Sequence, residues 1–316
     1  MIFVMDKKKL RVVFMGTPEI SATVLKALID DGYQIVGVIA QPDKPVGRKG
    51  ILEKVPTKVV AEQYNIPTFQ PVKIRKEYDF LKELNPDVIV TIAYGQIVSQ
   101  EVLDIPKYGC LNLHGSILPK YRGASPIQAA LINNESVSGM TLMQMIYKMD
   151  AGKMYDKELV KISEDDNCTS LFTKMGEAAK TLILRALPLY IDGKLEGVEQ
   201  DEDIATYCKM ISSEQEKIDF SMQGETIVGW IRALSDHPGA YLFLDDLKVK
   251  IFKARFSDEQ FEGSIGEIVK ADKNGLYIKV NDGVISILEL QKEGKKRMDY
   301  RSFINGNQNL LGKIAK

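Results

Sequence analysis

Short runs of β-branched and other apolar residues alternate with helical patterns over the first half of the chain. Such short apolar runs are typical of strands buried on both faces, and the periodic segments between them are typical of helices that cover a parallel sheet. The predicted strands are 11–15, 34–40, 88–93 and 108–114, and the predicted helices end near residues 31, 64 and 134. This alternation predicts an α/β fold with a Rossmann-like, mostly parallel sheet.

The pattern of hydrophobic and polar positions changes after the middle of the chain. Residues 139–148 and 154–162 are predicted as two paired strands, and 170–192 as an amphipathic helix that closes the domain. The next short strands are separated by turn residues, and they are predicted at 239–244, 248–256, 266–271, 276–280 and 284–290. We expect a first domain over 1–193, a polar linker over 194–208, and a small C-terminal β-barrel of the oligonucleotide-binding type over 209–316.

The turn after the first strand is Gly16-Thr17-Pro18-Glu19. It lacks the GxGxxG fingerprint, which disfavours a nicotinamide dehydrogenase although the fold would accommodate one. Gly16 is expected to form a tight turn, with Thr17 capping the helix and Pro18 at its first position.

Composition narrows the class without naming a function. Of 316 residues, 45% are hydrophobic and 27% charged, values near the average that give no indication of a disordered or fibrous protein. The three cysteines show no CxxC spacing, and the histidines and acids show no ligand spacing, so we expect neither disulfides nor a metal. The chain shows no secretory signal or membrane span, which favours a cytoplasmic protein without a membrane partner; we expect a monomer.

The formal net charge of −1 leaves nucleic-acid binding to local patches. Residues 41–58 and 292–301 each hold five positive and two negative side chains. Solvated loops are the commoner explanation of such charge runs, and the charges alone do not exclude it.

The candidate chemistry lies at the end of the strand 108–114. Side chains two residues apart share one face of a strand, so Asn112 and His114 project together from the carboxyl edge of the sheet. Downstream, Asp150 begins a turn and could orient an imidazole or help to move a proton. Each residue taken singly also has a structural explanation: a satisfied histidine for His114 and an Asx-type turn for Asp150.

The pattern Asn112-x-His114, followed by Ser116 to Pro119, Arg122-Gly123 and Met149-Asp150-x-Gly152, resembles the 10-formyltetrahydrofolate-dependent formyltransferases. Further segments that look like this family, in the same order, are 14–19, 41–48, 69–71, 93–95, 200–202, 205–207, 217–219 and 294–296. The resemblance covers nearly the whole chain. It is closest to the branch that acts on methionyl initiator tRNA.

The resemblance implies transfer of a formyl group from the co-substrate 10-formyltetrahydrofolate to the α-amine of methionyl initiator tRNA. By similarity, Asn112 donates to the developing oxyanion, His114 polarises the formyl oxygen or shuttles a proton, and Asp150 keeps His114 charged or oriented. Independently of the family, an amine that attacks a formyl group needs preorganised donors and a base. The residues matching the family's folate-contacting segments are Tyr94, Gly95, Gln96, Ile97, Ser116, Ile117, Leu118 and Pro119.

The resemblance also assigns a tRNA contact to the two basic patches. The residues expected to make it are Arg48, Lys49, Lys295, Lys296 and Arg297. Rival acceptors within the family are glycinamide ribonucleotide and amino sugars on nucleotides, and a related hydrolase releases formate. The C-terminal β-rich domain disfavours the glycinamide enzyme, which lacks it. A noncatalytic RNA-binding protein would leave Asn112, His114 and Asp150 unexplained.

Overall fold

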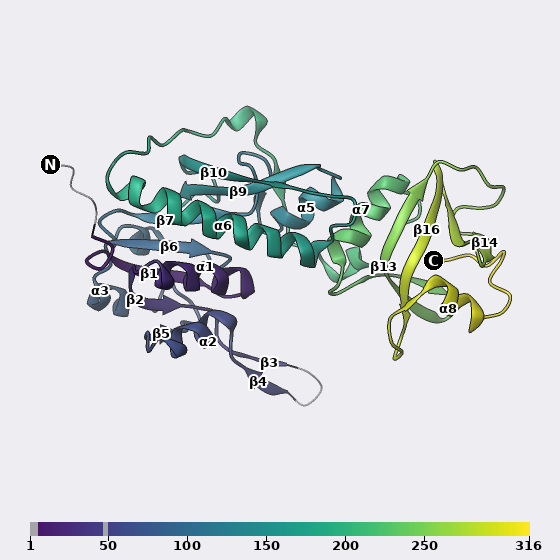
Figure 1. The fold of residues 1–316 in the computed structure, drawn as a ribbon, viewed down its shortest axis with the longest axis horizontal. Coiled ribbons are helices and arrows are strands. Elements are labelled where there is room, and N and C mark those ends of the chain that lie inside the picture. Colours follow the sequence, from purple (N-terminus) through teal and green to yellow (C-terminus); the bar gives the residue numbers. More distant parts are fainter. Residues whose placement is uncertain (1–5, 47–49) are drawn as a thin grey trace. The chain divides into compact units, whose positions relative to one another are not determined.

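The computed structural model describes residues 6–46 and 50–316, which form two compact units (Figure 1). The first unit comprises residues 1–126, 137–161 and 172–207, and the second comprises 127–136, 162–171 and 208–316. Within the described ranges, no helix is both long and apolar enough to cross a membrane.

The first unit is built on a seven-stranded sheet in the order β10-β9-β7-β6-β1-β2-β5. Strands β1, β2, β5, β6 and β7 are parallel, and β9 and β10 form an antiparallel hairpin at one edge. The strands are β1 (Arg11–Gly16), β2 (Gln34–Ile39), β5 (Thr68–Phe69), β6 (Val88–Ile92), β7 (Cys110–His114), β9 (Val137–Gln144) and β10 (Met154–Lys161). The predicted α/β fold with a mostly parallel sheet is confirmed.

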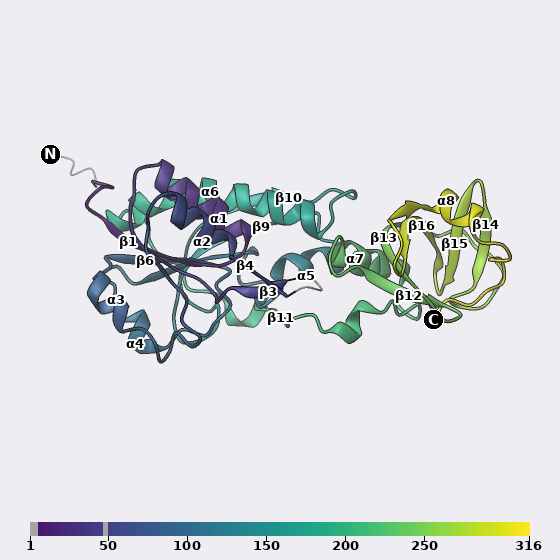
Figure 2. The ribbon, with the colours of Figure 1, turned by 90° about the horizontal axis from the view of Figure 1, so that it is seen from below.

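Helices cover both faces of this sheet, which explains why its central strands read as continuous apolar runs. Every residue of β6 is buried. Figure 2 shows α1 and α6 on one face and α3 and α4 on the other. The helices of this region are α1 (Glu19–Asp30), α2 (Pro56–Gln63), α3 (Asp79–Leu84), α4 (Gln100–Leu103) and α6 (Cys168–Ile191).

The strand order reverses between β1 and β6. After the edge strand β5 the chain crosses to the other side of β1, so the loops after β1 and β6 leave the sheet in different directions. Open α/β sheets bind their ligands at the carboxyl ends of strands at such a switch point. Gly16 allows these loops to pack closely, because a Cβ there would lie 2.7 Å from the Ile92 carbonyl oxygen.

Thr17 does not cap α1, contrary to the sequence prediction. The N-cap of α1 is Pro18, which makes no side-chain cap. The Thr17 hydroxyl instead accepts a hydrogen bond from the Gln41 backbone N–H at 3.2 Å and donates to the Tyr94 carbonyl at 3.3 Å. Thr17 therefore joins the loops after β1, β2 and β6.

Two further segments differ from the predicted elements. The basic loop contains a small hairpin of β3 (Lys44–Val46) and β4 (Ile51–Glu53). The strand expected over 139–148 already ends at Gln144, whose backbone N–H donates to the Lys153 carbonyl at 2.9 Å. Residues 145–152 thus form a loop that leaves the sheet, and Asp150 lies in it.

The segment expected as a linker, 194–208, is ordered against the first unit up to Tyr207. Val198 exchanges two backbone hydrogen bonds with Met154, each 2.8 Å long. A short helix, η1 (Glu202–Ile204), follows, and β11 (Tyr207–Cys208) then pairs with β8 (Arg122–Gly123).

The second unit contains an antiparallel sheet in the order β12-β13-β16-β15-β14, with β17 beside β16. Its strands are β12 (Ala240–Leu244), β13 (Leu247–Ser257), β14 (Ile268–Asp272), β15 (Gly275–Val280), β16 (Gly283–Lys292) and β17 (Met298–Asp299). The C-terminus extends the sheet, because Lys316 and Phe243 exchange two backbone hydrogen bonds and the Ala315 N–H donates to the Gly266 carbonyl. All five predicted strands are present.

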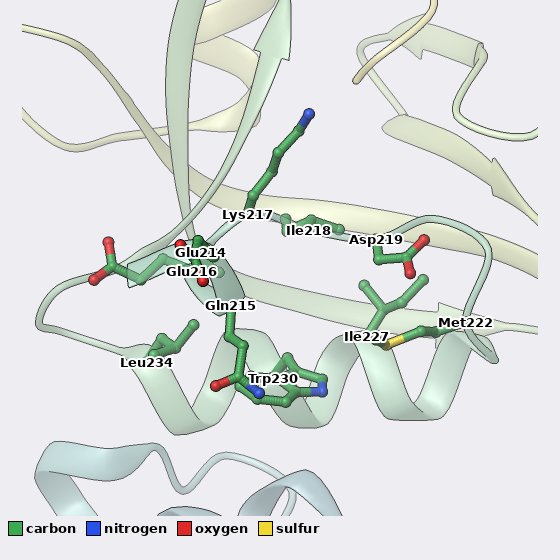
Figure 3. Close-up of a pocket in the computed structure, with 11 residues that line it drawn as sticks. Glu214, Gln215, Glu216, Lys217, Ile218, Asp219, Met222, Ile227, Trp230 and Leu234 are labelled. Carbon is green, nitrogen blue, oxygen red and sulfur yellow. The ribbon is translucent and has the colours of Figure 1, made fainter. Parts of the chain in front are cut away.

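Helices complete this unit, of which α5 was predicted from the sequence and η2, α7 and α8 were not. The sheet residues Val249 and Ile251 and the α7 residues Ile227 and Ile231 belong to one buried core. Beside it, Met222, Ile227 and Trp230 line a pocket whose rim carries acidic side chains (Figure 3). The helices are α5 (Pro126–Ile132), η2 (Ser213–Glu216), α7 (Gly224–Leu234) and α8 (Tyr300–Asn305).

Candidate active site

Asn112 and His114 lie at the carboxyl end of β7, on one face of the strand as the alternation predicts. His114 is buried, with 5% of its surface exposed, whereas Asn112 is half-buried. In the described part of the chain, the Asn112 side chain has no hydrogen-bond partner, although most polar groups at this depth have one. Its amide hydrogens are therefore available to a bound molecule.

Both ring nitrogens of His114 face oxygen atoms. Nε2 lies 2.9 Å from the Tyr121 carbonyl oxygen, and Nδ1 lies 3.7 Å from Oδ1 of Asp150. A carbonyl can only accept a hydrogen bond, so Nε2 carries a proton in this arrangement. The atom of the ring that can gain or lose a proton is therefore Nδ1, on the side of Asp150.

Asp150 is held in an unusual backbone conformation, with a φ of 48°. Its Oδ2 accepts a hydrogen bond from the Gly123 backbone N–H at 2.9 Å, which leaves Oδ1 to face His114. Asp tolerates left-handed φ values better than most residues. The structure thus brings together all three predicted catalytic side chains, from β7 and from the loop between β9 and β10.

Behind this group lies Arg122, which is fully buried. Its guanidinium donates to Gln200 at 2.9 Å, to Glu202 at 3.0 and 3.2 Å, and to the Tyr207 hydroxyl at 3.2 Å. Burial lowers the pKa of Arg122, but the bonds to Glu202 and Tyr207 outweigh this effect and raise the pKa above its ordinary value. Hydrogen bonds from Arg122 and then Lys148 lower the pKa of Glu202 to about 2.

The loop after β7 is held by hydrogen bonds within the loop and from β9. The Ser116 hydroxyl donates to the Lys120 carbonyl at 2.5 Å, and the Thr141 hydroxyl donates to the Ser116 carbonyl at 2.7 Å. Ser116 and Leu118 are buried, whereas Ile117 and Pro119 are half-buried. Of the four predicted folate-contacting residues in this loop, Ile117 and Pro119 are the more accessible.

The loop after β6 carries the other predicted folate contacts. Tyr94 is buried, and burial raises the pKa of its hydroxyl. Gln96 is used internally, because its Oε1 accepts from the Ile74 N–H at 2.9 Å and its Nε2 donates to the Pro71 carbonyl at 3.0 Å. Gly95 and Ile97 are exposed, so backbone groups and one apolar side chain are accessible in this loop.

The basic residues fall into different situations. Arg48 and Lys49 lie outside the described residues, between β3 and β4. In the second unit, Lys295 and Lys296 are exposed in the turn between β16 and β17. Arg297 is engaged within the same unit, since it pairs with Asp236 and Glu289 at 2.5 Å each.

The sequence patterns missed the roles of Gln200 and Thr206. Both fall in the segment assigned to a linker because it is polar and lacks periodicity. Gln200 donates to the Asp150 and Gly152 carbonyls, and Thr206 accepts from the Tyr121 N–H. The resemblance of 200–202 and 205–207 to the family was the sequence feature that pointed to this segment. It does not predict which groups Gln200 and Thr206 contact.

Two family models match this chain. Residues 8–187 match the model described as "Formyl transferase", and residues 210–308 match "Formyl transferase, C-terminal domain". The chain belongs to the formyl transferase family. A methionyl-tRNA formyltransferase of Bacillus cereus is 43% identical over 306 residues, which cover 96% of this chain and 98% of the relative.

Solved structures share the fold at low sequence identity. The N-formyltransferase from Helicobacter canadensis, in complex with folinic acid and dTDP-3-aminofucose, has a TM-score of 0.68 at 21% identity. It covers 90% of this formyl transferase chain and 99% of its own. A methionyl-tRNA formyltransferase from Clostridium thermocellum has a TM-score of 0.55 at 16% identity, covering 79% and 95%.

Proposed function

We propose that this formyl transferase moves the formyl group of 10-formyltetrahydrofolate to the α-amine of methionyl initiator tRNA, at a site formed by Asn112, His114 and Asp150. The observation that carries the chemistry is the free amide of Asn112 on the same strand face as His114. The acceptor is inferred from the methionyl-tRNA formyltransferase of Bacillus cereus, which is similar over almost its full length.

Asn112 stabilises the developing negative charge in this proposal. An amine that adds to a formyl carbon leaves negative charge on the formyl oxygen, so the enzyme needs a donor placed there in advance. The Asn112 amide is such a donor, since no described residue occupies its hydrogens. It is fixed at the end of a sheet strand, which limits reorganisation during the reaction.

The His114 and Asp150 pair handles the proton that the attacking amine must lose. Nε2 of His114 is committed to the Tyr121 carbonyl, so Nδ1 takes up the proton on the side of Asp150. The 3.7 Å separation is longer than a direct hydrogen bond, and such contacts commonly tighten when substrate binds. The Asp150 carboxylate then stabilises the charged ring.

The loops after β6 and β7 fit a folate donor. When bound, 10-formyltetrahydrofolate supplies an activated formyl group on its N10 nitrogen. Ile97 and Ile117 offer apolar contact beside accessible backbone groups at Gly95, a combination suited to a planar heterocycle with donors and acceptors. Near these loops, the Thr91 hydroxyl is buried and has no hydrogen-bond partner among the described residues.

The second unit is proposed to bind the tRNA acceptor. Lys295 and Lys296 project from its β16–β17 turn without an ion pair to any described residue, as phosphate-binding lysines must. Arg48 and Lys49 are proposed as further contacts from the basic loop. Arg297 contributes less in this proposal, because it already pairs with Asp236 and Glu289.

An amino-sugar nucleotide is the second candidate acceptor. The Helicobacter canadensis enzyme in complex with dTDP-3-aminofucose shares the fold, but at 21% identity it supports the fold alone. The test is a competition assay, with purified protein, 10-formyltetrahydrofolate, methionyl initiator tRNA and a dTDP-amino sugar. We expect formylation of the tRNA and none of the sugar. Preferential formylation of the sugar would reject the proposed acceptor while retaining the proposed chemistry.

A further inference from the structure

One short segment, residues 200–207, fixes both groups that face the His114 ring. We propose that Gln200 and Thr206 in this segment are positioning residues for formyl transfer, Gln200 through the Asp150 loop and Thr206 through Tyr121. The inference deepens the proposed function and rests on it for the reaction itself. It concerns contacts within the first unit only.

Gln200 uses both of its amide hydrogens to hold the Asp150 loop. Its Oε1 accepts from Arg122 Nε at 2.9 Å, and its Nε2 donates to the carbonyls of Asp150 and Gly152 at 2.8 Å each. The amide has one orientation, because the flipped form would place its oxygen against two carbonyls and its NH₂ against a guanidinium. Gln200 thereby fixes the backbone from which the Asp150 carboxylate reaches His114.

Thr206 holds Tyr121, whose carbonyl is the other group that faces the His114 ring. Its hydroxyl accepts from the Tyr121 backbone N–H at 2.9 Å, and its carbonyl accepts from the Arg122 backbone N–H at 2.8 Å. Tyr121 has a positive φ of 58°, which is uncommon for an aromatic residue and needs such support. Its carbonyl is the one that accepts from Nε2 of His114.

Arg122 connects the contacts of Gln200 and Thr206, because it bonds to both residues. Its buried guanidinium bonds to Gln200, Glu202 and Tyr207, all within residues 200–207. A buried cation keeps its partners in place, because separating them would leave a charge in a poorly solvated site. The orientation of the His114 ring and the distance from Nδ1 to Asp150 therefore depend on where this segment lies.

The test uses substitutions that change hydrogen bonds with little change in shape. Gln200→Glu keeps the oxygen that faces Arg122 and removes both amide hydrogens, and Thr206→Val removes the hydroxyl. We expect each to lower kcat about tenfold to a hundredfold, as expected for small misplacement of reacting groups, with KM for both substrates nearly unchanged. Thr206→Ser should restore the wild-type kcat. Ile204→Ala is the matched control, since Ile204 lies in the same segment with 60% of its surface exposed.

A spectroscopic readout separates positioning from simple loss of structure. The chain has two histidines, His114 and His237, so ¹⁵N-histidine labelling gives two sets of ring signals. We expect the His114 signals to change in Gln200→Glu and Thr206→Val and the His237 signals to stay as in wild type. If Gln200→Glu does not fold, Thr206→Val with its serine rescue carries the test.

The outcomes are distinct. A folded Thr206→Val or Gln200→Glu protein with wild-type His114 signals would overturn the inference, whether its kcat is normal or reduced together with a raised KM. Changed His114 signals with a reduced kcat support it. The NMR measurement needs no substrate, so a wild-type protein that fails to formylate methionyl-tRNA, while the His114 signals still respond to these variants, would reject the proposed function alone.

Discussion

Oδ1 of Asp150 lies 3.7 Å from Nδ1 of His114, while Oδ2 of the same carboxylate accepts a hydrogen bond from the backbone of Gly123. One oxygen thus anchors the side chain, and the other faces the ring nitrogen that can exchange a proton. Because Oδ2 anchors the side chain and Oδ1 faces His114, a substitution can remove the second role and keep the first.

Asp150→Asn keeps an oxygen for the Gly123 N–H, tolerates the positive φ, and removes the negative charge opposite His114. We expect kcat to fall about 10²-fold to 10⁴-fold, the range typical of a lost acid–base partner, with the thermal midpoint close to wild type. Steady-state kinetics and thermal unfolding measure both quantities. An Asn variant with the wild-type kcat would show that the charge is not needed.

The Glu202 carboxylate makes the stability of the folded protein depend on pH in the acid range. Hydrogen bonds from Arg122 and Lys148 hold the pKa of this carboxyl at about 2 in the folded protein, against 4.5 for an ordinary glutamate. A lowered pKa stabilises the fold above pH 4.5, and this contribution is lost as the pH falls from 4.5 towards 2.

Glu202→Gln should therefore be less stable than wild type above pH 4.5, with a difference that shrinks as the pH falls towards 2. Thermal unfolding across this pH range measures the difference. Glu199→Gln is the control, because Glu199 forms an exposed pair with Lys153 and such pairs contribute little. A Glu202→Gln deficit that stays constant with pH would contradict the ion-pair account.

Gly16 is predicted to be essential for packing at the switch point. An added Cβ would lie 2.7 Å from the Ile92 carbonyl oxygen and 2.7 Å from the Ser21 Cβ, so the loops after β1 and β6 would have to separate. We expect Gly16→Ala to destabilise the protein by about 1–3 kcal/mol, the usual cost of overpacking. In the control Gly176→Ala, the nearest side-chain atom would lie at an ordinary 3.5 Å. Denaturant unfolding that finds the two variants equally stable would refute this packing argument.

Lys295 and Lys296 are predicted to contact phosphates of the tRNA. Replacing both by alanine should weaken binding and reduce the slope of log affinity against log salt by about 1–2, since each lost phosphate contact removes nearly one. Lys313→Ala is the control, because Lys313 is already paired with Asp245 at 2.6 Å. Salt titrations of tRNA binding measure the slopes, and an unchanged slope in the double variant would exclude this surface from the phosphate contact.

The sequence predicts the part of the site that depends on strand periodicity. The alternation in β7 puts Asn112 and His114 on one face, and the turn residues after β9 place Asp150 in a loop. The strands of the first sheet could also be predicted from the sequence, because their apolar runs follow from burial on both faces.

The contacts of Gln200 and Thr206 could not be predicted in this way. Gln200 meets Asp150 across 50 residues, and Thr206 meets Tyr121 across 85. The nearby pair of β8 and β11 joins strands that are only two residues long. Such short pairings have no measurable period, so polarity alone suggested a linker. Helix α7 could have been predicted from the sequence, because its buried residues Ile227, Ile231 and Leu234 have helical spacing.

The most direct test of the proposed site is the single-turnover rate of formyl transfer from 10-formyltetrahydrofolate to methionyl initiator tRNA by wild type, Asn112→Asp and His114→Ala. Asn112→Asp replaces the free amide donor with a carboxylate of nearly the same shape. We predict rapid transfer by wild type and a rate at least about 100-fold lower in each folded variant, the usual cost of losing an oxyanion donor or a proton carrier. Rates within about twofold of wild type in both variants would contradict the assignment of the chemistry to this site, because losing either group should cost far more.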